Sequence, residues 1–233
     1  MLTIAAQSLK RVVLPIAALL LFMIGLGLLL TRLASHTWPL TVEDGVNREF
    51  AADRTETLSD ISHLVSGVAD TPRIVAATAV AALVLWLVLR RLREPLFLSL
   101  AVIAQALVFY FTTLAIDRPR PAVDRMDVSP PTSSFPSGHT SAAVALYIGL
   151  AVVLASLARR TWLKALCWAL VLVPVGVAFA RMYRGMHHPS DVVAAFVNGC
   201  TCVIVMARAV LDRSVSWRPG SRATAGAAVP STA

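Results

Sequence analysis

The chain has 233 residues, of which 57% are hydrophobic and 15% are charged, with a formal net charge of +8 and a mean hydropathy of +0.72. This composition is too apolar for an ordinary soluble domain and is typical of an integral membrane protein. The positive charge comes from arginines scattered at the ends of apolar segments, whereas a nucleic-acid-binding protein would gather them on one face, so we expect no nucleic-acid partner.

Six apolar segments are near the length that a helix needs to cross a bilayer, so we predict an all-α fold, an integral membrane bundle of six transmembrane helices. The first segment is long enough to favour a membrane anchor over a cleaved signal peptide. Prolines at 72 and 95 suit the first turn of a helix, and Pro174 predicts a kink in the fifth segment. The predicted helices cover approximately residues 12–33, 72–91, 95–116, 138–158, 162–180 and 189–211.

The longest polar stretch joins the first and second helices. Leu58, Ile61, Val65 and Val68 recur in it at spacings of three and four residues, which indicates a short amphipathic helix on the membrane surface or over the bundle. An ordered connecting loop is the alternative. At the other end, residues 212–233 are rich in Ser, Gly, Pro and Ala, so we expect the membrane domain to end at residue 211 and a disordered cytoplasmic tail to follow.

Basic residues indicate how the bundle is oriented. Six crossings place both termini on one side, together with the basic loops that follow the second and fourth helices, and the bias of Lys and Arg identifies that side as cytoplasmic. Three polar clusters then share the extracytoplasmic face: residues 117–121, 133–140 and 181–191. Arginines on this face run against the topological bias, which suggests that a ligand retains them there.

The first and third clusters carry Arg118, Arg120 and Arg181. A guanidinium is a planar fork of donors that matches phosphate oxygens and keeps its charge at working pH, so these arginines indicate an anion such as phosphate. Pro119 and Pro121 stiffen the first cluster, which reduces the entropy lost on binding. The alternative for any single arginine is an interfacial contact with lipid headgroups.

The middle cluster contains Pro136-Ser137-Gly138-His139, immediately before an apolar segment. Ser137 suits the N-cap of a helix, and the backbone N–H groups at such a start, that of Gly138 among them, form a site for an anion. A histidine in these polar surroundings can exchange protons near neutral pH, which makes His139 a candidate acid and base. The alternative for His139 is a capping or interfacial histidine.

In the third cluster, a helix that begins at Pro189 would place Asp191 at its third position, from which a carboxylate reaches back toward the residues before the cap. A carboxylate bonded to one ring nitrogen of His187 would leave the other nitrogen unprotonated and aimed outward, as a nucleophile requires. His188 is the alternative partner of Asp191, or the pair simply caps the helix.

In this order and spacing, the motifs resemble the signature of the type 2 phosphatidic acid phosphatase superfamily, in its bacterial membrane lipid phosphatase branch. That signature is Lys, six residues, Arg-Pro; then Pro-Ser-Gly-His; then Ser-Arg, five residues, His, three residues, Asp. The matching residues are Arg120-Pro121, Pro136-Ser137-Gly138-His139, Arg181, His187 and Asp191. Thr113 stands where the family has its lysine, and Ala180 replaces the serine.

The resemblance implies hydrolysis of a lipid phosphate at the outer leaflet of the cell membrane, without a metal or other cofactor. His187 would attack phosphorus to give a phosphohistidine, Asp191 would orient it, and His139 would protonate the leaving oxygen and later activate water. The groups implied to hold the phosphate oxygens are Arg120, Arg181, the Ser137 hydroxyl and the Gly138 N–H, with Arg118 in place of the missing lysine. The implied substrate is a polyprenyl phosphate or diphosphate, or a phosphatidate-type lipid.

Three rival interpretations stay open. A phosphotransferase would pass the phosphoryl group to a lipid or sugar with the same residues. A lipid-phosphate binder or transporter would have lost activity with the lysine at position 113, although binding alone needs neither His139 nor His187. A vanadate-dependent haloperoxidase shares the residue set, but those enzymes are soluble, so the apolar helices argue against it.

Overall fold

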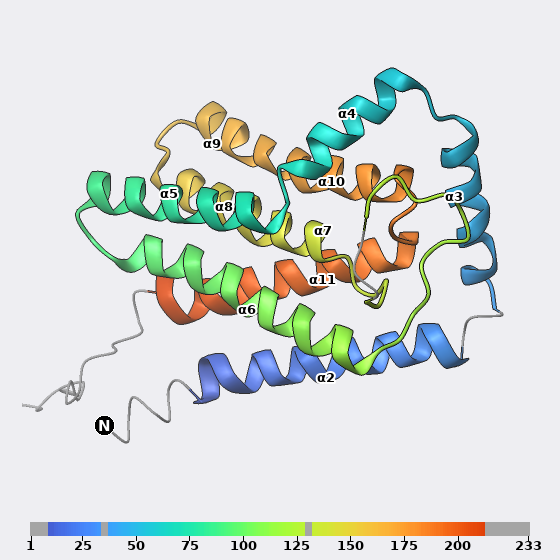
Figure 1. Ribbon diagram of the computed structural model, residues 1–233. Coiled ribbons are helices and arrows are strands. Elements are labelled where there is room, and N and C mark those ends of the chain that lie inside the picture. Colours follow the sequence, from blue (N-terminus) through green and yellow to red (C-terminus); the bar gives the residue numbers. More distant parts are fainter. Residues whose placement is uncertain (1–8, 34–36, 129–131, 213–233) are drawn as a thin grey trace, which may run out of the picture.

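The computed structural model of the protein describes residues 9–33, 37–128 and 132–212 (Figure 1). Six helices in this part of the chain are long and apolar enough to cross a membrane. They span Leu9–Leu33, Thr71–Leu89, Arg93–Ala115, Gly138–Leu157, Thr161–Tyr183 and Pro189–Leu211. The predicted fold, an all-α integral membrane bundle of six transmembrane helices, is confirmed. Apart from Asp212, the predicted tail lies outside the described residues.

Several crossings combine more than one helical element. The first is α2 (Leu14–Leu28) between π-helical turns at Leu9–Val13 and Leu29–Leu33. The second and third are α5 (Thr71–Leu89) and α6 (Arg93–Ala115). The fourth joins α7 (Gly138–Ala143), a π-helical turn (Val144–Ile148) and α8 (Gly149–Leu157). The fifth joins α9 (Thr161–Trp168), a 3-10 turn (Ala169–Val171) and α10 (Leu172–Tyr183), and the sixth is α11 (Pro189–Met206) with a π-helical turn (Ala207–Leu211).

The fifth crossing is irregular at the proline that predicted a kink. The chain changes from α-helix to a 3-10 turn just before Pro174, which lies in the first turn of α10. Proline has no N–H to bond the carbonyl of Leu170, four residues earlier, and its ring crowds that carbonyl. The local change of helix type relieves both problems.

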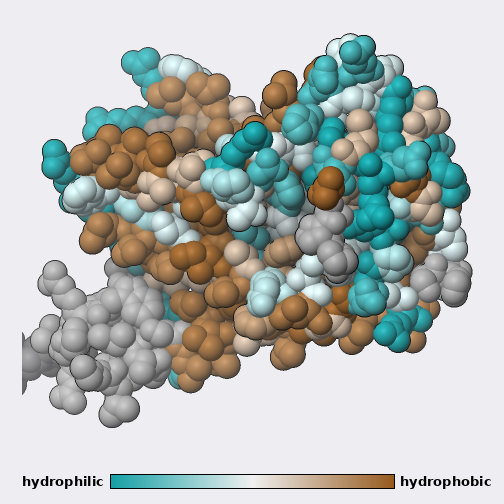
Figure 2. Space-filling model, viewed as in Figure 1, coloured by the Kyte–Doolittle hydropathy of each residue, from teal (hydrophilic) through white to brown (hydrophobic). Residues whose placement is uncertain are grey.

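At the centre of the bundle, α11 runs beside α6 and also packs against the fourth crossing, to which Val144 belongs (Figure 1). At Gly199 of α11, a Cβ would come within 2.5 Å of Val144, so only glycine allows this approach. The outer faces of the helices are apolar, with exposed Val75 on α5 and Leu107 on α6. Figure 2 shows hydrophobic side chains over α2, α5 and α6 and hydrophilic ones over α3 and α4, as expected where lipid meets the first group only.

The polar stretch between the first two crossings is helical. It forms a 3-10 turn (Leu40–Val42), α3 (Glu43–Ala52) and α4 (Glu56–Gly67), so the amphipathic helix is confirmed and the loop alternative is wrong. Val65 of α4 packs against the hydrophobic core, and α4 lies along α10. Arg54, between α3 and α4, donates to the carbonyl of Tyr183 at 3.0 Å, which ties both helices to the end of α10.

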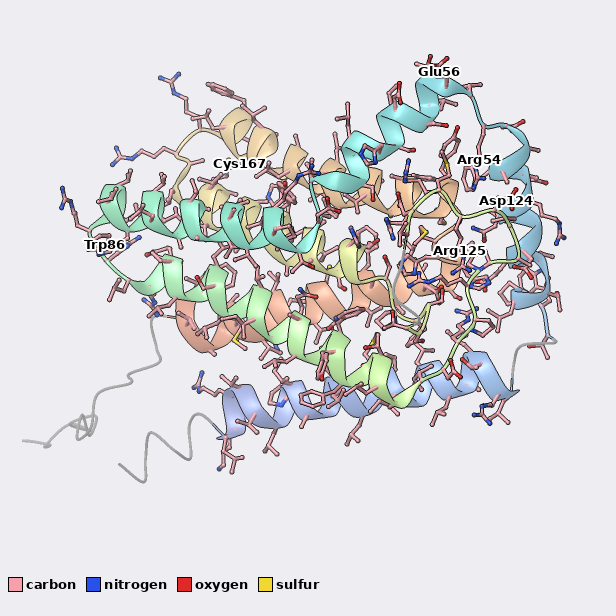
Figure 3. All side chains as sticks on the ribbon, in the orientation of Figure 1. Arg54, Glu56, Trp86, Asp124, Arg125 and Cys167 are labelled. Atoms are coloured by element: carbon pink, nitrogen blue, oxygen red, sulfur yellow. The ribbon has the colours of Figure 1, made fainter. Side chains whose placement is uncertain are left out.

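All three polar clusters lie at the end of the bundle that α3 and α4 cover. Figure 3 shows Arg54, Asp124 and Arg125 at this end and Trp86 far from it. The basic loops that follow α5 and α8 lie at the other end, because each crossing spans the bundle once. The clusters therefore meet at a single place.

Candidate active site

Residues from all three polar clusters line one cavity of about 370 Å³. Its polar lining includes the predicted site residues Arg120, Gly138, His139, Arg181 and His187. Its apolar lining comes mainly from α5 and α6 and includes Ile74, Val75, Val102, Ala106 and Phe109. The tertiary structure thus brings five of the predicted residues together and places them beside a hydrophobic wall.

His187 lies between α10 and α11 and is almost fully buried. Its Nδ1 is 2.8 Å from the carbonyl oxygen of Ser134 and 3.8 Å from Oδ2 of Asp191. Because a carbonyl only accepts, Nδ1 carries the proton and Nε2 keeps a free lone pair. Burial lowers the pKa of His187 to about 4, reinforced by the guanidinium of Arg181 and opposed by the Asp191 carboxylate. The ring is therefore neutral near pH 7, in the tautomer that a nucleophile at Nε2 requires.

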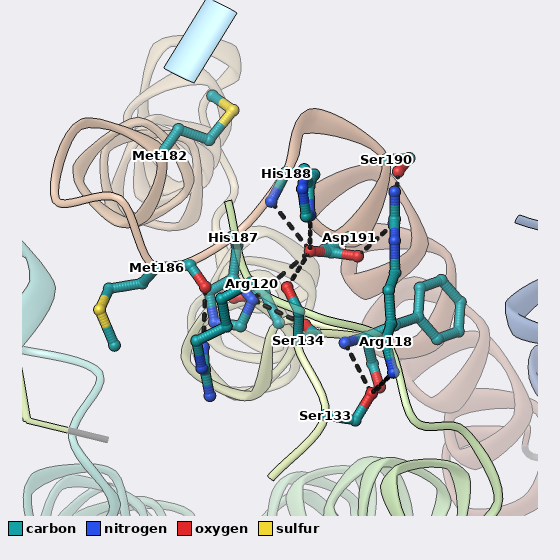
Figure 4. Close-up of polar contacts among 12 residues, drawn as sticks. Arg118, Arg120, Ser133, Ser134, Met182, Met186, His187, His188, Ser190 and Asp191 are labelled. Atoms are coloured by element: carbon teal, nitrogen blue, oxygen red, sulfur yellow. Dashed lines mark hydrogen bonds and ion pairs between the residues drawn. The ribbon is translucent and has the colours of Figure 1, made fainter. Parts of the chain in front are cut away.

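The Asp191 carboxylate, which is fully buried, organises the start of α11 (Figure 4). Its Oδ2 accepts the backbone N–H of His188 at 2.8 Å and the hydroxyl of Ser134, and Oδ1 pairs with Arg118. The His187 ring is thus within hydrogen-bond distance of the Ser134 carbonyl. The hydroxyl of the same serine donates to Asp191. Sequence reasoning missed the role of Ser134, which lies two residues before the first residue of the Pro-Ser-Gly-His motif.

Arg118 lies apart from the cavity, in a buried ion-pair network. Its guanidinium pairs with Asp191 and with Glu43 of α3 at 2.7 Å, and it donates to the Ser190 hydroxyl at 2.7 Å. Glu43 also accepts the backbone N–H of Ser190 at 2.8 Å. The position of Arg118 does not support the predicted role as a substitute phosphate ligand. Arg118 lies here because it pairs with Glu43, which is 75 residues earlier in the chain. No local sequence motif could have linked Glu43 to Arg118.

Arg120 and Arg181 both face the cavity. Nη1 of Arg120 donates to the Met186 carbonyl at 2.7 Å, next to the nucleophile candidate. Nη1 of Arg181 donates to the Ser66 hydroxyl at 3.0 Å and to Asp127 at 2.8 Å. Within the described residues, the buried Nε of Arg181 has no partner. An unpaired buried N–H is costly, and a phosphate oxygen in the cavity would satisfy it.

Arg120 also borders a wider polar basin of about 1120 Å³, which shares Thr132 with the first cavity. Arg48 of α3 and Arg125 line this basin as well. Burial lowers the pKa of Arg120, and so does repulsion from Arg125, but a guanidinium remains charged at neutral pH. The lining of the basin holds four arginines (Arg48, Arg118, Arg120 and Arg125) and two aspartates (Asp117 and Asp124), so positive charge is in excess, and the basin adjoins the cavity that contains the histidines.

Ser137 and Gly138 have different roles at the start of α7. Ser137 is the predicted N-cap: its Oγ accepts the Thr140 N–H at 3.4 Å and lies 2.9 Å from the Thr140 hydroxyl. This hydroxyl is buried in the cap, and Ser137 is not among the cavity-lining residues. Gly138 does line the cavity, and a Cβ there would come within 2.8 Å of the Phe109 ring of α6. Any larger residue at 138 would force the Phe109 ring to shift, so glycine is what allows α7 to begin this close to α6 with the ring in its present place.

His139 has a carboxylate partner that sequence reasoning missed. Its Nε2 lies 3.0 Å from Oδ1 of Asp70, the residue that precedes α5. Asp70 occupies the N-cap position of a helix with proline in its first turn, but nothing local links it to His139. The pair forms because α5 packs against α7.

A third missed residue, Asp127, bridges two arginines of the third cluster. It accepts hydrogen bonds from Arg181 at 2.8 Å and from Nε of Arg184 at 2.9 Å. Burial tends to raise the pKa of Asp127, but the hydrogen bond from Arg184 and the charges of both arginines outweigh it and lower the pKa. Thr113, in the position of the family lysine, donates its hydroxyl to the Tyr110 carbonyl of its own helix at 2.8 Å. Across residues 9–33, 37–128 and 132–212, His, Cys, Asp and Glu side chains form no group of three or more suited to a metal ion.

Comparisons with known proteins agree with this geometry. The model of the PAP2 superfamily matches residues 95–214. Undecaprenyl-diphosphatase BcrC of Bacillus subtilis (strain 168) is 30% identical over 129 residues, which cover 53% of this chain and 62% of that protein, less than two thirds of its length.

Two solved structures share the fold. A transmembrane PAP2-type phosphatidylglycerolphosphate phosphatase from Bacillus subtilis superposes with a TM-score of 0.73 at 19% identity, over 86% of this chain and 97% of that one. LpxE of Aquifex aeolicus superposes with a TM-score of 0.54 at 22% identity, over 72% of this chain and 95% of that one. At these identities the likeness concerns the fold.

Proposed function

Because the chain belongs to the PAP2 superfamily, we propose that it is a membrane lipid phosphatase that hydrolyses a polyprenyl phosphate or diphosphate, or a phosphatidate-type lipid, through a phosphohistidine. The observation that carries this proposal is the single cavity that holds both histidines, two arginines and an apolar wall. The similarity to an undecaprenyl-diphosphatase supports a polyprenyl substrate, and the fold shared with a phosphatidylglycerolphosphate phosphatase is compatible with a glycerolipid.

In the proposed mechanism, Nε2 of His187 attacks phosphorus in line with the leaving oxygen. The phosphorus–oxygen bond to the lipid breaks, and His139 gives a proton to the departing oxygen. Water then attacks the phosphohistidine while His139 takes its proton, which releases inorganic phosphate and restores His187. Arg120, Arg181 and the Gly138 N–H meet the negative charge of the transition state.

The apolar wall supports a lipid as the leaving group. Ile74 and Phe109 line the cavity beside the histidines, and Val75, which also lines it, is 60% exposed on the outer face of α5. The hydrophobic lining therefore continues to the surface that faces lipid. A lipid chain can lie there while its phosphate reaches His187. Water can enter, and product phosphate can leave, through the polar basin at Arg120.

We further propose that the active site is extracytoplasmic and that both termini are cytoplasmic, because basic loops lie at the opposite end of the bundle. Two single-cysteine variants in a cysteine-free background test this, both at exposed positions. Asp124→Cys should react with a membrane-impermeant maleimide in intact cells, and Arg160→Cys only after permeabilisation. The reverse pattern would overturn the orientation.

The activity is tested by phosphate release from purified protein with polyprenyl diphosphate, phosphatidate and phosphatidylglycerolphosphate. Arginines meet the phosphate charge in this mechanism, so turnover should persist in excess chelator. His187→Ala should abolish turnover, and His63→Ala, an exposed histidine of α4, is the matched control. Activity that the chelator removes, or that survives in His187→Ala, would refute the mechanism.

A further inference from the structure

Asn47 of α3 is a fully buried amide that bonds the backbone at both ends of the turn that carries His187. This histidine turn (residues 184–188) joins α10 to α11. Nδ2 of Asn47 donates to the Met182 carbonyl, in the last turn of α10, at 3.3 Å and to the His187 carbonyl at 3.1 Å. A single amide nitrogen therefore ties the end of α10 to the residue proposed as the nucleophile.

The carbonyl of His187 lies outside the hydrogen-bond ladder of α11. The first backbone N–H groups that bond across the start of this helix go to the carbonyl of His188, at 3.1 and 3.3 Å. On the other side, the end of α10 closes where the Met186 N–H donates to the Arg181 carbonyl at 3.0 Å. The donor that holds the backbone at His187 comes from α3, which lies outside the residues that the superfamily model matches.

The ring and the backbone of His187 are held by different groups. Nδ1 bonds the Ser134 carbonyl, which fixes the tautomer but lets the ring pivot about that bond. The bond from Asn47 fixes the main chain from which the side chain projects. The direction of Nε2 depends on both bonds, and a displacement of about 1 Å at a reacting atom can slow a reaction about 100-fold.

An asparagine at this place costs stability. Within the described part of the chain, the buried Oδ1 of Asn47 has no hydrogen-bond partner, and a leucine would fill nearly the same volume without that cost. Glu43, one turn earlier in α3, accepts the Ser190 N–H at 2.8 Å, just beyond the histidine turn. Thus α3 offers a donor to the carbonyl before the helix cap and an acceptor to an N–H after it, which is an arrangement suited to holding the turn in place.

We propose that Asn47 is a positioning residue of the phosphatase, whose two hydrogen bonds hold the backbone of the histidine turn so that Nε2 of His187 points at phosphorus. This inference rests on the proposed function. Asn47 is not among the residues that line the cavity, so it acts through His187 and not on the substrate. Loss of its donors should therefore slow the attack on phosphorus without weakening lipid binding.

The first test is Asn47→Leu, which removes both donors and nearly keeps the volume. The measured quantity is the rate of phosphohistidine formation in a single turnover, over a range of concentrations of polyprenyl diphosphate or phosphatidylglycerolphosphate. The saturating rate should fall by about 10- to 100-fold, while the half-saturating lipid concentration stays within about twofold of the wild type. Asn198→Leu is the matched control and should keep the wild-type rate, because Asn198 is also fully buried and donates to a backbone carbonyl, that of Gln105, at 3.2 Å.

The second test is Asn47→Asp, which keeps the shape and adds a readout that lost stability would not mimic. A protonated carboxyl can donate one of the two hydrogen bonds, whereas the ionised form repels both carbonyls. Burial raises the pKa of the new carboxyl. The rate in Asn47→Asp relative to that in Asn47→Leu should therefore exceed one at low pH and fall as the pH rises. If Asn47→Leu does not fold, the pH dependence of Asn47→Asp compared with the wild type carries the test.

Two results would overturn the inference and leave the phosphatase proposal standing. One is a saturating rate in Asn47→Leu that equals the wild-type rate or falls no further than in Asn198→Leu. The other is a pH dependence of Asn47→Asp that parallels that of the wild type. A wild-type protein that forms no phosphohistidine with either lipid would refute the proposed function itself, and the inference with it.

Discussion

Replacing Arg118 by methionine distinguishes a buried structural ion from a phosphate ligand. The Arg118 side chain is 8% exposed, and its partners Glu43 and Asp191 are 8% and 0% exposed. Methionine keeps most of the apolar stem but removes the charge, so two buried carboxylates lose the cation they share.

The size of the effect follows from this burial. Removing one partner of a buried ion pair costs about 3–5 kcal/mol. Asp191 keeps hydrogen bonds from the His188 N–H and the Ser134 hydroxyl, so we expect the lower end of that range. For a chain of this length, about 3 kcal/mol corresponds to a fall in Tm of about 6–12 °C.

The assay is thermal unfolding of the purified protein in detergent. Arg120→Met is the control: Arg120 is only half-buried and, within the described part of the chain, bonds a backbone carbonyl and no carboxylate, so the Tm of this variant should change little while phosphate release is lost. Adding Glu43→Gln to Arg118→Met should recover part of the stability, because one uncompensated charge is removed. The reasoning is refuted if Arg118→Met unfolds at the wild-type temperature and shows only a raised KM.

Three further predictions concern the groups around the cavity. The pKa of His187 is about 4 in the folded protein and 6.5 in the unfolded chain, so the unfolded state binds the proton first and stability is lost as pH falls from 6.5 toward 4. His187→Gln has no such titration, so the Tm difference between this variant and the wild type should shift in favour of the variant as the pH falls from 6.5 toward 4. A Tm difference that stays constant over this pH range would contradict the lowered pKa of His187. Gly138→Ala should lose most phosphate release because its Cβ meets the Phe109 ring, and adding Phe109→Leu should restore part of it; an active single variant would show that the contact is unimportant. Asp70→Asn should lower kcat about tenfold with KM unchanged, because the ring of His139 loses the carboxylate that holds it. A change in KM alone would instead place Asp70 in substrate binding.

The sequence by itself determined the membrane fold and identified five of the residues that line the candidate site. Six apolar segments of spanning length admit few structures other than a helical bundle, because backbone groups in lipid must bond within the helix. The N-cap at Ser137 and the start of α11 at Pro189 were predictable because capping depends on residues only a few positions apart. His139 and His187 were expected on the same side of the membrane because the number of crossings between their clusters is even.

Only the tertiary structure decided what each polar side chain contacts. Arg118 pairs with Glu43, and His139 with Asp70, because α3 and the start of α5 pack against the end of the bundle. These contacts join residues far apart in the chain, and their energies depend on burial, which a local sequence pattern does not encode.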